Sequence, residues 1–245
     1  MLKEIFNIIF PEKLNCLACG DEYTIQADAS YFCEKCTIEL QVLEDRCSKC
    51  DRPVESVYNQ LGLYLYKCKA CQEQFHYYTR HLSCARYEGA AKKLIMDFKY
   101  KGKVENAKGI AEQMYRRLQS ENILDQIQGI VPTPIHWTRR WTRGFNQSEL
   151  IAKALNDMLR NQVEIIVLKR CKKTKKLKNL NKDARKQMLK DAIILSRDLH
   201  SNIEKKKLLI IDDIYTTGAT VDACSKVLYE AGAEEIYCIT FAMGQ

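Results

Sequence analysis

Paired cysteines are the first residues in this sequence whose spacing could do chemistry. Two cysteines separated by two residues can direct both thiolates at one metal ion, and two such pairs supply the four sulfur ligands that Zn²⁺ prefers. Four such pairs follow one another along the chain: Cys16 and Cys19, Cys33 and Cys36, Cys47 and Cys50, and Cys68 and Cys71. We therefore expect two structural zinc ions, each closed by four cysteines, with no open coordination position for catalysis.

The pairing of these motifs leaves alternatives open. Sequential pairing, first with second and third with fourth, is the simplest arrangement, but the spacing also permits interleaved pairs. Buried free cysteines, disulfides in a secreted module and redox sensing are the alternatives to structural metal. Eight of the twelve cysteines lie in this stretch, which is too short to fold on an apolar core alone. We therefore expect its folding to require metal.

A second segment carries residues suited to binding a phosphate. Four apolar residues from Leu208 predict a buried strand that ends at two carboxylates, Asp212 and Asp213. A turn of small residues then opens a helix: Thr216, Thr217, Gly218, Ala219 and Thr220. Backbone N–H groups at a helix N-terminus bind phosphate without any lysine. The alternative is that the acids only end a strand and cap a helix. No Gly-x-x-x-x-Gly-Lys sequence is present, which excludes a nucleoside-triphosphatase loop.

Arginines and tryptophans follow a predicted strand in the middle of the chain. That strand, residues 127–131, stops at Pro132-Thr-Pro, and the arginines that come next are Arg139, Arg140 and Arg143. Guanidinium groups here would clamp pyrophosphate or nucleic-acid phosphates, and the alternative is a solvated charged face. Trp137 and Trp141 lie one turn apart if this loop is helical, and they suit either base stacking or buried packing.

One segment makes the protein basic. Residues 169–190 hold eleven Lys or Arg against one acid, Asp183, so this segment carries +10 and the rest of the chain about −2 of the formal +8. Its first part, Lys169 to Asn179, contains no glycine or proline and little apolar content, which predicts a mobile loop. Such a loop could close over a ligand, bind a polyanion through counterion release, or simply be solvated. The lysines that we expect to contact phosphates are Lys172, Lys173, Lys175 and Lys176.

The elements that must position these residues alternate between helix and strand from residue 84 onward. Apolar spacing predicts helices near 90–98, 107–118, 150–158 and 221–228, and strands near 127–131, 163–168, 208–211 and 236–241. This alternation predicts an α/β fold with a mostly parallel sheet, in which ligands bind at the carboxyl ends of the strands. We expect residues 1–80 to form a small zinc domain and residues 81–245 to form the α/β domain.

The stretch from Leu208 to Thr220 resembles the signature with which type I phosphoribosyltransferases bind 5-phosphoribosyl diphosphate (PRPP). This resemblance implies that Asp212 and Asp213 act as catalytic residues and hold the ribose hydroxyls, directly or through a Mg²⁺ ion that accompanies PRPP. It also implies that the turn from Thr216 to Thr220 wraps the 5-phosphate. The fold that it implies is a parallel-sheet, type I phosphoribosyltransferase-like domain, here preceded by a zinc-ribbon domain.

The motifs taken together resemble the ComF/GntX family of competence proteins. The resemblance rests on Pro132-Thr-Pro, Arg143-Gly-Phe-Asn-Gln147, Phe98-Lys-Tyr-Lys-Gly102, the phosphate signature and the cysteine pairs. It implies a role in natural transformation, in which the protein handles incoming single-stranded DNA beside a competence helicase and a strand-loading protein. The sequence departs from the family pattern at Leu177 and Met188, and these changes weaken the case for catalytic closure of the lysine-rich loop.

Three functions follow from these observations. The first is a DNA-uptake factor that binds single strands and a ribose phosphate, and the second is an active phosphoribosyltransferase with an unidentified acceptor. The third is an interaction module whose zinc domain docks a partner. Because no export signal and no apolar run of about 20 residues is found, we expect a cytoplasmic protein that reaches the inner face of the membrane only through partners.

Overall fold

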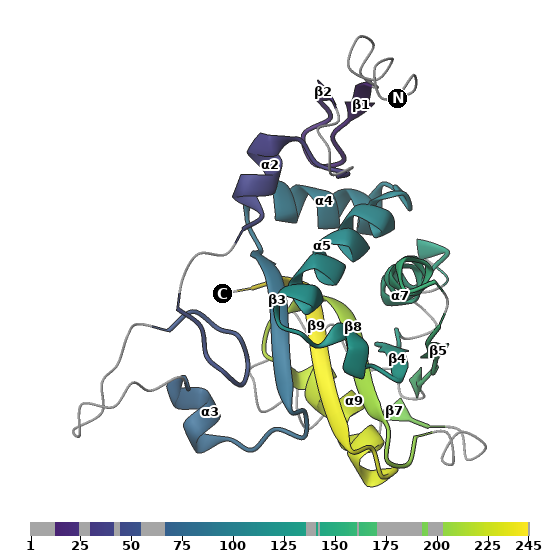
Figure 1. Ribbon diagram of the computed structural model, residues 1–245. Coiled ribbons are helices and arrows are strands. Elements are labelled where there is room, and N and C mark those ends of the chain that lie inside the picture. Colours follow the sequence, from purple (N-terminus) through teal and green to yellow (C-terminus); the bar gives the residue numbers. More distant parts are fainter. Residues whose placement is uncertain are drawn as a thin grey trace, which may run out of the picture.

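The computed structural model describes residues 13–24, 30–41, 45–54, 67–135, 141, 143–160, 162–170, 193–195 and 203–244. Within these residues, five strands form the central sheet in the order β3–β9–β8–β4–β5, and every neighbouring pair is parallel (Figure 1). Their bounds are β3 Arg80–Arg86, β4 Gly129–Pro132, β5 Glu164–Ile165, β8 Lys207–Tyr215 and β9 Glu235–Met243. The predicted α/β class with a parallel sheet is confirmed.

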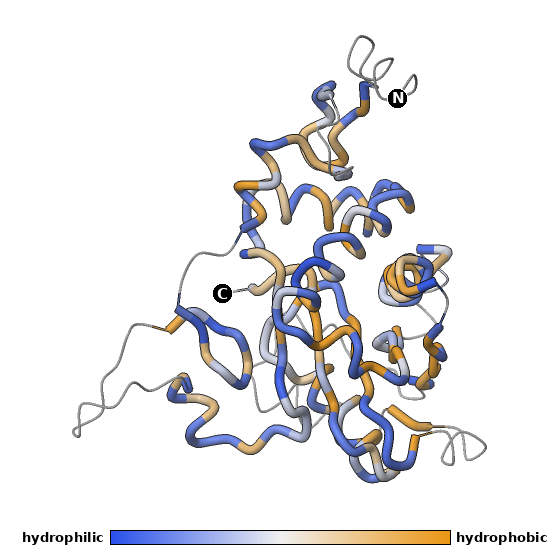
Figure 2. The backbone as a smooth tube through the Cα atoms, viewed as in Figure 1, coloured by the Kyte–Doolittle hydropathy of each residue, from blue (hydrophilic) through white to orange (hydrophobic). Residues whose placement is uncertain are grey.

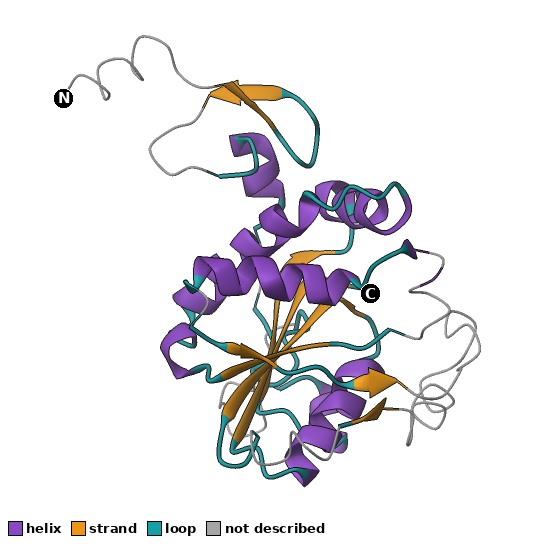
Figure 3. Cartoon of the chain, turned by 90° about the vertical axis from the view of Figure 1, so that its right-hand side faces the viewer, coloured by secondary structure: helices purple, strands orange, loops and turns teal. Residues whose placement is uncertain are grey.

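Helices cover both faces of this sheet (Figures 1 and 3). On one face lie α4 Gly89–Tyr100, α5 Asn106–Ser120 and α7 Gln147–Met158, and on the other lies α9 Ala219–Glu230. Successive side chains of a strand point to opposite faces, so Leu209 and Ile211 of β8 join the core under α4, α5 and α7, whereas Leu208 and Ile210 join the core under α9. Strand β8 is therefore apolar on both faces. Figure 2 shows the hydropathy of each residue along the chain.

The two longest strands extend further than their apolar runs predict. Strand β9 pairs with β8 as far as Tyr215 and Met243, so β8 continues through Asp212 and Asp213 instead of ending before them. The predicted strand at 163–168 is shorter: β5 pairs with β4 at only two positions. A short 3₁₀ helix, η1 Leu124–Gln126, precedes β4.

The basic segment begins in a small hairpin of strands. Strand β6 Lys169–Arg170 pairs antiparallel with β7 Ile193–Ile194, so the start of the segment lies beside residues that come after it in the chain. Ile193 is buried in the core under α9. Residues 171–192 lie outside the described part of the chain, and so do the four lysines expected to contact phosphates, Lys172, Lys173, Lys175 and Lys176.

The first cysteine-rich stretch rests on the helices above the sheet (Figure 1). It contains an antiparallel pair, β1 Lys13–Asn15 and β2 Glu22–Thr24, and helix α2 Glu34–Glu39. Leu17 and Phe32 approach α5 so closely at Gly109 that a Cβ there would come within 2.8 Å of the Phe32 ring. Glycine at this position therefore permits the contact.

The second cysteine-rich stretch lies along β3, the edge strand of the sheet. Residues 45–54 and 67–79, with helix α3 Lys69–Glu73, make up its described part. The His81 N–H of β3 donates to the Lys49 carbonyl (2.9 Å), so this stretch covers groups that an edge strand would otherwise expose. Both cysteine-rich stretches thus pack on the α/β core, and the division into domains at residue 80 stays a prediction. None of the described helices has the length and hydrophobicity that a membrane span needs.

Candidate phosphate site and metal centres

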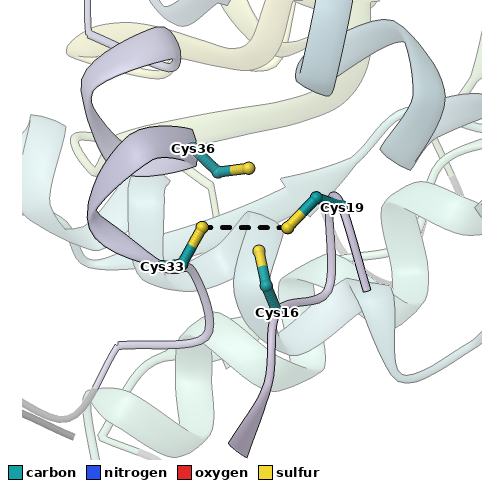
Figure 4. Close-up of side chains that lie close together, drawn as sticks. All are labelled: Cys16, Cys19, Cys33 and Cys36. Carbon is teal, nitrogen blue, oxygen red and sulfur yellow. Dashed lines mark hydrogen bonds between the residues drawn. The ribbon is translucent and has the colours of Figure 1, made fainter. Parts of the chain in front are cut away.

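The eight paired cysteines form two groups of four. The sulfur atoms of Cys16, Cys19, Cys33 and Cys36 lie within 4.8 Å of one another, and so do those of Cys47, Cys50, Cys68 and Cys71. Figure 4 shows the first group, with its four sulfurs converging from α2 and from the turn before β2. The groups follow the sequential pairing, and interleaved pairing is wrong.

The sulfur spacing fits zinc. A tetrahedron with Zn–S bonds of about 2.3 Å has S···S edges of about 3.8 Å. The Cys19 and Cys33 sulfurs are 3.8 Å apart, and those of Cys50 and Cys68 are 3.6 Å apart. The Cys68 N–H also donates to the Cys47 sulfur (3.3 Å). Both groups could hold zinc as closed, structural sites.

The same tight turn builds the first half of each group. The Cys16 N–H donates to the Asp21 carbonyl (2.9 Å), and the Cys47 N–H donates to the Arg52 carbonyl (2.8 Å). The residue after the second cysteine of each turn has a positive φ, 92° at Gly20 and 60° at Asp51. Glycine takes this conformation without strain, but aspartate does so at a cost.

At Asp51, hydrogen bonds and ion pairs of the side chain offset the cost of the positive φ. This carboxylate is 2% exposed and accepts hydrogen bonds from the Ser83 N–H (2.7 Å) and the Ser83 hydroxyl (2.9 Å). It also pairs with Arg46 at 2.6 Å and with Arg117 at 3.4 Å. Asp51 thus fastens the second cysteine turn to β3, a role that glycine could not fill.

The predicted phosphate turn lies between β8 and α9. A cavity of about 60 Å³ is lined by Asp212, Ile214, Tyr215, Thr216, Thr217, Gly218, Ala219, Thr220 and Val221. Gly218 precedes α9 with φ 78° and has no side chain that could cap the first turn of the helix. A Cβ at Gly218 would collide with the Tyr215 hydroxyl. These features suit an anion at the start of the helix.

The two carboxylates of the turn differ in their electrostatics. Asp212 accepts hydrogen bonds from the Ser148 hydroxyl (3.2 Å) and the Asp213 N–H (2.9 Å). Burial raises the pKa of Asp212 to about 6, and the neighbouring charge of Asp213 adds to the rise. Asp213 is paired instead with the Lys99 ammonium at 2.6 Å. Asp212 can therefore exchange a proton near neutral pH, while Asp213 is held as an ion pair.

The Arg-Gly-Phe-Asn-Gln segment organises the wall beside these carboxylates. Asn146 caps α7 by accepting from the Ser148 N–H, and it donates to the Thr133 carbonyl (3.1 Å). The Thr133 and Ser148 hydroxyls are 2.9 Å apart. Phe145 stacks on Phe98 with ring centroids 5.6 Å apart. The segment thus holds Ser148 against Asp212 and packs on the helix that carries Lys99.

The structure places only part of the predicted arginine cluster. Arg143 donates to the Gln147 side chain (3.1 Å) and lies over the Tyr100 ring at 5.4 Å, so it supports the wall of the site. Trp141 is 84% exposed, and buried packing is therefore wrong for this tryptophan. Arg139, Arg140 and Trp137 lie outside the described residues. Phosphate contact by any of these arginines stays a prediction.

Four residues that contact the predicted site residues are not predicted from the sequence: Lys99, Thr133, Ser148 and Arg52. Thr133 and Lys99 lie within the Pro132-Thr-Pro and Phe98-Lys-Tyr-Lys-Gly102 motifs, which mark their positions without marking a role. Ser148 directly follows the Arg-Gly-Phe-Asn-Gln segment. Arg52 donates a hydrogen bond to the Thr216 carbonyl, and nothing in the sequence connects that cysteine-rich stretch with the phosphate turn.

The fold and the site define an α/β protein with a parallel sheet, a phosphate-type turn and two possible metal centres. Several curated proteins are similar to the chain over most of its length. Competence protein F of Haemophilus influenzae is 26% identical over 217 residues, which cover 84% of this chain and 94% of the relative. DNA utilization protein YhgH of Escherichia coli K12 is 26% identical, covering 84% and 88%. Competence protein ComFC of Bacillus subtilis is 25% identical, covering 90% of each chain.

These homologues confirm the resemblance to competence proteins, although no family model matches the chain. Solved structures similar to the chain include a PRPP synthetase from Mycobacterium smegmatis (TM-score 0.34, 17% identity, 55% of this chain) and a purine phosphoribosyltransferase from Pyrococcus horikoshii (TM-score 0.34, 13% identity, 56% of this chain). The chain spans 33% of the synthetase and 80% of the transferase.

Proposed function

We propose that this protein acts in the uptake or utilisation of DNA, binding single-stranded DNA through its basic segment and a ribose phosphate such as PRPP at the β8–α9 turn. The names of its homologues support the general role. The observation that carries the pocket is that Asp212 and the uncapped first turn of α9 line one cavity. The Lys99–Asp213 ion pair stands at the residue next to Asp212.

Each part of the pocket suits one part of the ligand. Backbone N–H groups of the turn after Thr216 would receive the 5-phosphate, since they lie at a helix start and need no lysine. Asp212 would accept hydrogen bonds from the ribose hydroxyls. A Mg²⁺ ion that accompanies the diphosphate would find carboxylate oxygens here, the ligands that it prefers, although Lys99 already occupies one oxygen of Asp213.

The pocket is tested by calorimetric titration of the zinc-loaded protein with PRPP and Mg²⁺, and separately with ribose 5-phosphate. We expect binding of both, weakened about tenfold by Asp212→Asn because the ribose loses a charged acceptor. Asp157→Asn is the matched control, since Asp157 is exposed on α7. Failure of the wild-type protein to bind either compound would remove this part of the proposal.

DNA binding is tested by reversing charge in the basic segment. Changing Lys172, Lys173, Lys175 and Lys176 to Glu should abolish tight binding of a labelled single-stranded oligonucleotide. It should also reduce the slope of log affinity against log salt by about 3, as expected for four lost phosphate contacts. The control reverses four exposed lysines elsewhere: Lys69, Lys92, Lys108 and Lys153. Equal losses in the two variants would point to net charge alone and contradict a local binding segment.

The partners stay proposals as well. A competence helicase and a strand-loading protein fit the role of the homologues, and association with them would bring the protein to the inner face of the membrane. Co-purification from a transformable host that depends on residues 1–80 would favour docking through the cysteine-rich stretch, and co-purification that depends on residues 81–245 would count against it.

A further inference from the structure

The second cysteine group lies directly against the phosphate turn. Its first turn ends at Arg52, whose guanidinium donates to the backbone carbonyl of Thr216 and lies 5.7 Å from the centre of the Tyr215 ring. Thr216 and Tyr215 both line the cavity. A side chain from the N-terminal stretch therefore reaches the loop that we expect to bind phosphate, more than 160 positions further along the chain.

Other residues of the same stretch hold the neighbouring elements. His76 Nδ1 lies 2.8 Å from the carboxylate of Asp222, in the first turn of α9. The Tyr78 hydroxyl lies 3.1 Å from the Tyr215 hydroxyl. Contacts from this stretch thus reach the end of β8, the turn and the start of α9, which are the three parts of the pocket.

The hydrogen bond from Arg52 fixes the direction of one peptide unit. The carbonyl of Thr216 and the N–H of Thr217 belong to the same unit, and in a trans peptide these groups point in opposite directions. No described peptide bond is cis. Because Arg52 holds the carbonyl on its own side, the Thr217 N–H is directed to the other side. The preceding carbonyl, of Tyr215, is held as well, by the Gly244 N–H at 2.8 Å.

The cysteine turn can hold Arg52 firmly because its backbone is fixed at several points. The Cys47 N–H donates to the Arg52 carbonyl, the Asp51 N–H donates to the Cys47 carbonyl (2.9 Å), and the Asp51 side chain is fastened to Ser83. A metal on the four sulfurs would lock this turn, since both of its cysteines would be ligands.

The first cysteine group provides an internal comparison. Its turn has the same backbone hydrogen bonds, but Asp21 stands where the second turn has Arg52. Asp21 is exposed. The described contacts of the first group reach the helices instead, with Lys93 of α4 donating to the Cys19 carbonyl (3.1 Å).

We propose that Arg52 is a positioning residue of the phosphate site, and that metal binding by Cys47, Cys50, Cys68 and Cys71 sets the affinity of that site for a phosphorylated sugar. The inference rests on the proposed function of the pocket. With metal bound, the turn holds Arg52 against Thr216, and the Thr217 N–H faces the phosphate. Without metal the peptide is free to rotate, and the phosphate loses a donor.

The test titrates the full-length, zinc-loaded protein with ribose 5-phosphate by calorimetry. Arg52→Ala should weaken binding about tenfold, whereas Arg52→Lys should recover part of the loss because an ammonium can still donate to a carbonyl. Asp21→Ala is the matched control and should bind as the wild type does. Zinc analysis of each variant shows whether both metals are retained.

A second readout separates positioning from general damage. In the amide NMR spectrum without ligand, Arg52→Ala should shift the Thr217 and Gly218 signals and leave those of α4 and α5 unchanged. For the metal, Cys68→Ser should weaken ribose 5-phosphate binding, whereas Cys33→Ser, in the first group, should not.

The outcomes are distinct. Wild-type affinity in Arg52→Ala, or equal losses in Cys33→Ser and Cys68→Ser, would overturn the inference while the proposed function stands. If the wild-type protein itself fails to bind ribose 5-phosphate and PRPP, the proposed function fails and the inference falls with it. The graded loss in the two Arg52 variants, with a silent Asp21→Ala control, would support it.

Discussion

The ammonium of Lys99 lies 2.6 Å from a carboxylate oxygen of Asp213, and both side chains are largely buried, 15% and 12% exposed. Lys99 lies near the end of α4, whereas Asp213 is on the central strand β8. This ion pair joins the Phe98-Lys-Tyr-Lys-Gly102 segment to the phosphate turn, and it neutralises one of two adjacent acids.

Breaking this ion pair should show how strongly Lys99 and Asp213 depend on each other for their contribution to the free energy of unfolding. Lys99→Met leaves the Asp213 carboxylate unpaired and should lower the free energy of unfolding by about 2 kcal/mol, below the range for fully buried pairs because some solvent reaches both groups. Adding Asp213→Asn to Lys99→Met should restore part of that loss. Urea unfolding of the two single variants and the double variant measures the coupling, and strict additivity of the two single changes would contradict it.

The half-buried carboxylate of Asp212 should make stability depend on pH. Its pKa is raised to about 6 in the folded protein, above the value of about 3.9 for an unfolded chain. The folded state therefore binds this proton more tightly, and the contribution of Asp212 to stability falls as pH rises from about 4 to 6. Asp212→Asn keeps an oxygen for Ser148 and should stabilise the protein at pH 7 by about 2 kcal/mol.

Thermal unfolding of Asp212→Asn and wild type between pH 4 and pH 8 checks this expectation. The two curves should converge near pH 4, separate between pH 4 and pH 6, and keep a constant difference above pH 6. A destabilised variant at pH 7 would mean that the carboxylate is better solvated than its position implies.

Removal of metal should unfold the cysteine-rich stretches. We expect two zinc ions per chain by elemental analysis, released by a strong chelator together with the loss of the melting transition of those stretches. Cys36→Ser should retain one zinc, because the second group is independent of it. Full zinc content in Cys36→Ser would contradict a four-cysteine site in the first group.

Apart from its two cysteines, Asp51 should be the most sensitive residue of the second turn. Asp51→Ala removes the acceptor of the Ser83 N–H and the buried partner of Arg46, so we expect a loss of about 3 kcal/mol in the free energy of unfolding. Asp157→Ala, an exposed change of the same kind, should cost less than about 0.5 kcal/mol. An equally small loss in the free energy of unfolding for Asp51→Ala would show that the turn does not depend on the contacts of Asp51 with Ser83 and Arg46.

The sequence was sufficient to predict the parts of the fold that follow local patterns. Apolar periodicity placed α4, α5, α7 and α9, and apolar runs placed the starts of β8 and β9, because these elements bury one face or a continuous core segment. The cysteine spacing predicted two four-cysteine groups with sequential pairing as the simplest arrangement, and the structure excludes the interleaved alternative. The phosphate turn was found from its small residues after two acids.

The features that could not be predicted depend on contacts between residues that lie far apart in the sequence. Strand β3 has no apolar pattern, because His81 and Ser83 are buried polar residues. The second cysteine turn satisfies them: the Cys50 carbonyl accepts from His81 Nδ1 (2.9 Å), and Asp51 accepts from Ser83. The contact of Arg52 with the phosphate turn was missed for the same reason, since it depends on the position of β3 beside β9.

The most direct test of the proposed function is fluorescence anisotropy of labelled single-stranded DNA with the zinc-loaded protein, measured at several salt concentrations with and without PRPP and Mg²⁺. We predict tight binding of the DNA that weakens steeply as the salt concentration rises. We also predict that PRPP changes the affinity for DNA, because the pocket and the basic segment are proposed to act together in binding DNA. No binding at low salt would contradict the proposed role in handling DNA, and the search would turn to acceptors for a phosphoribosyltransferase reaction.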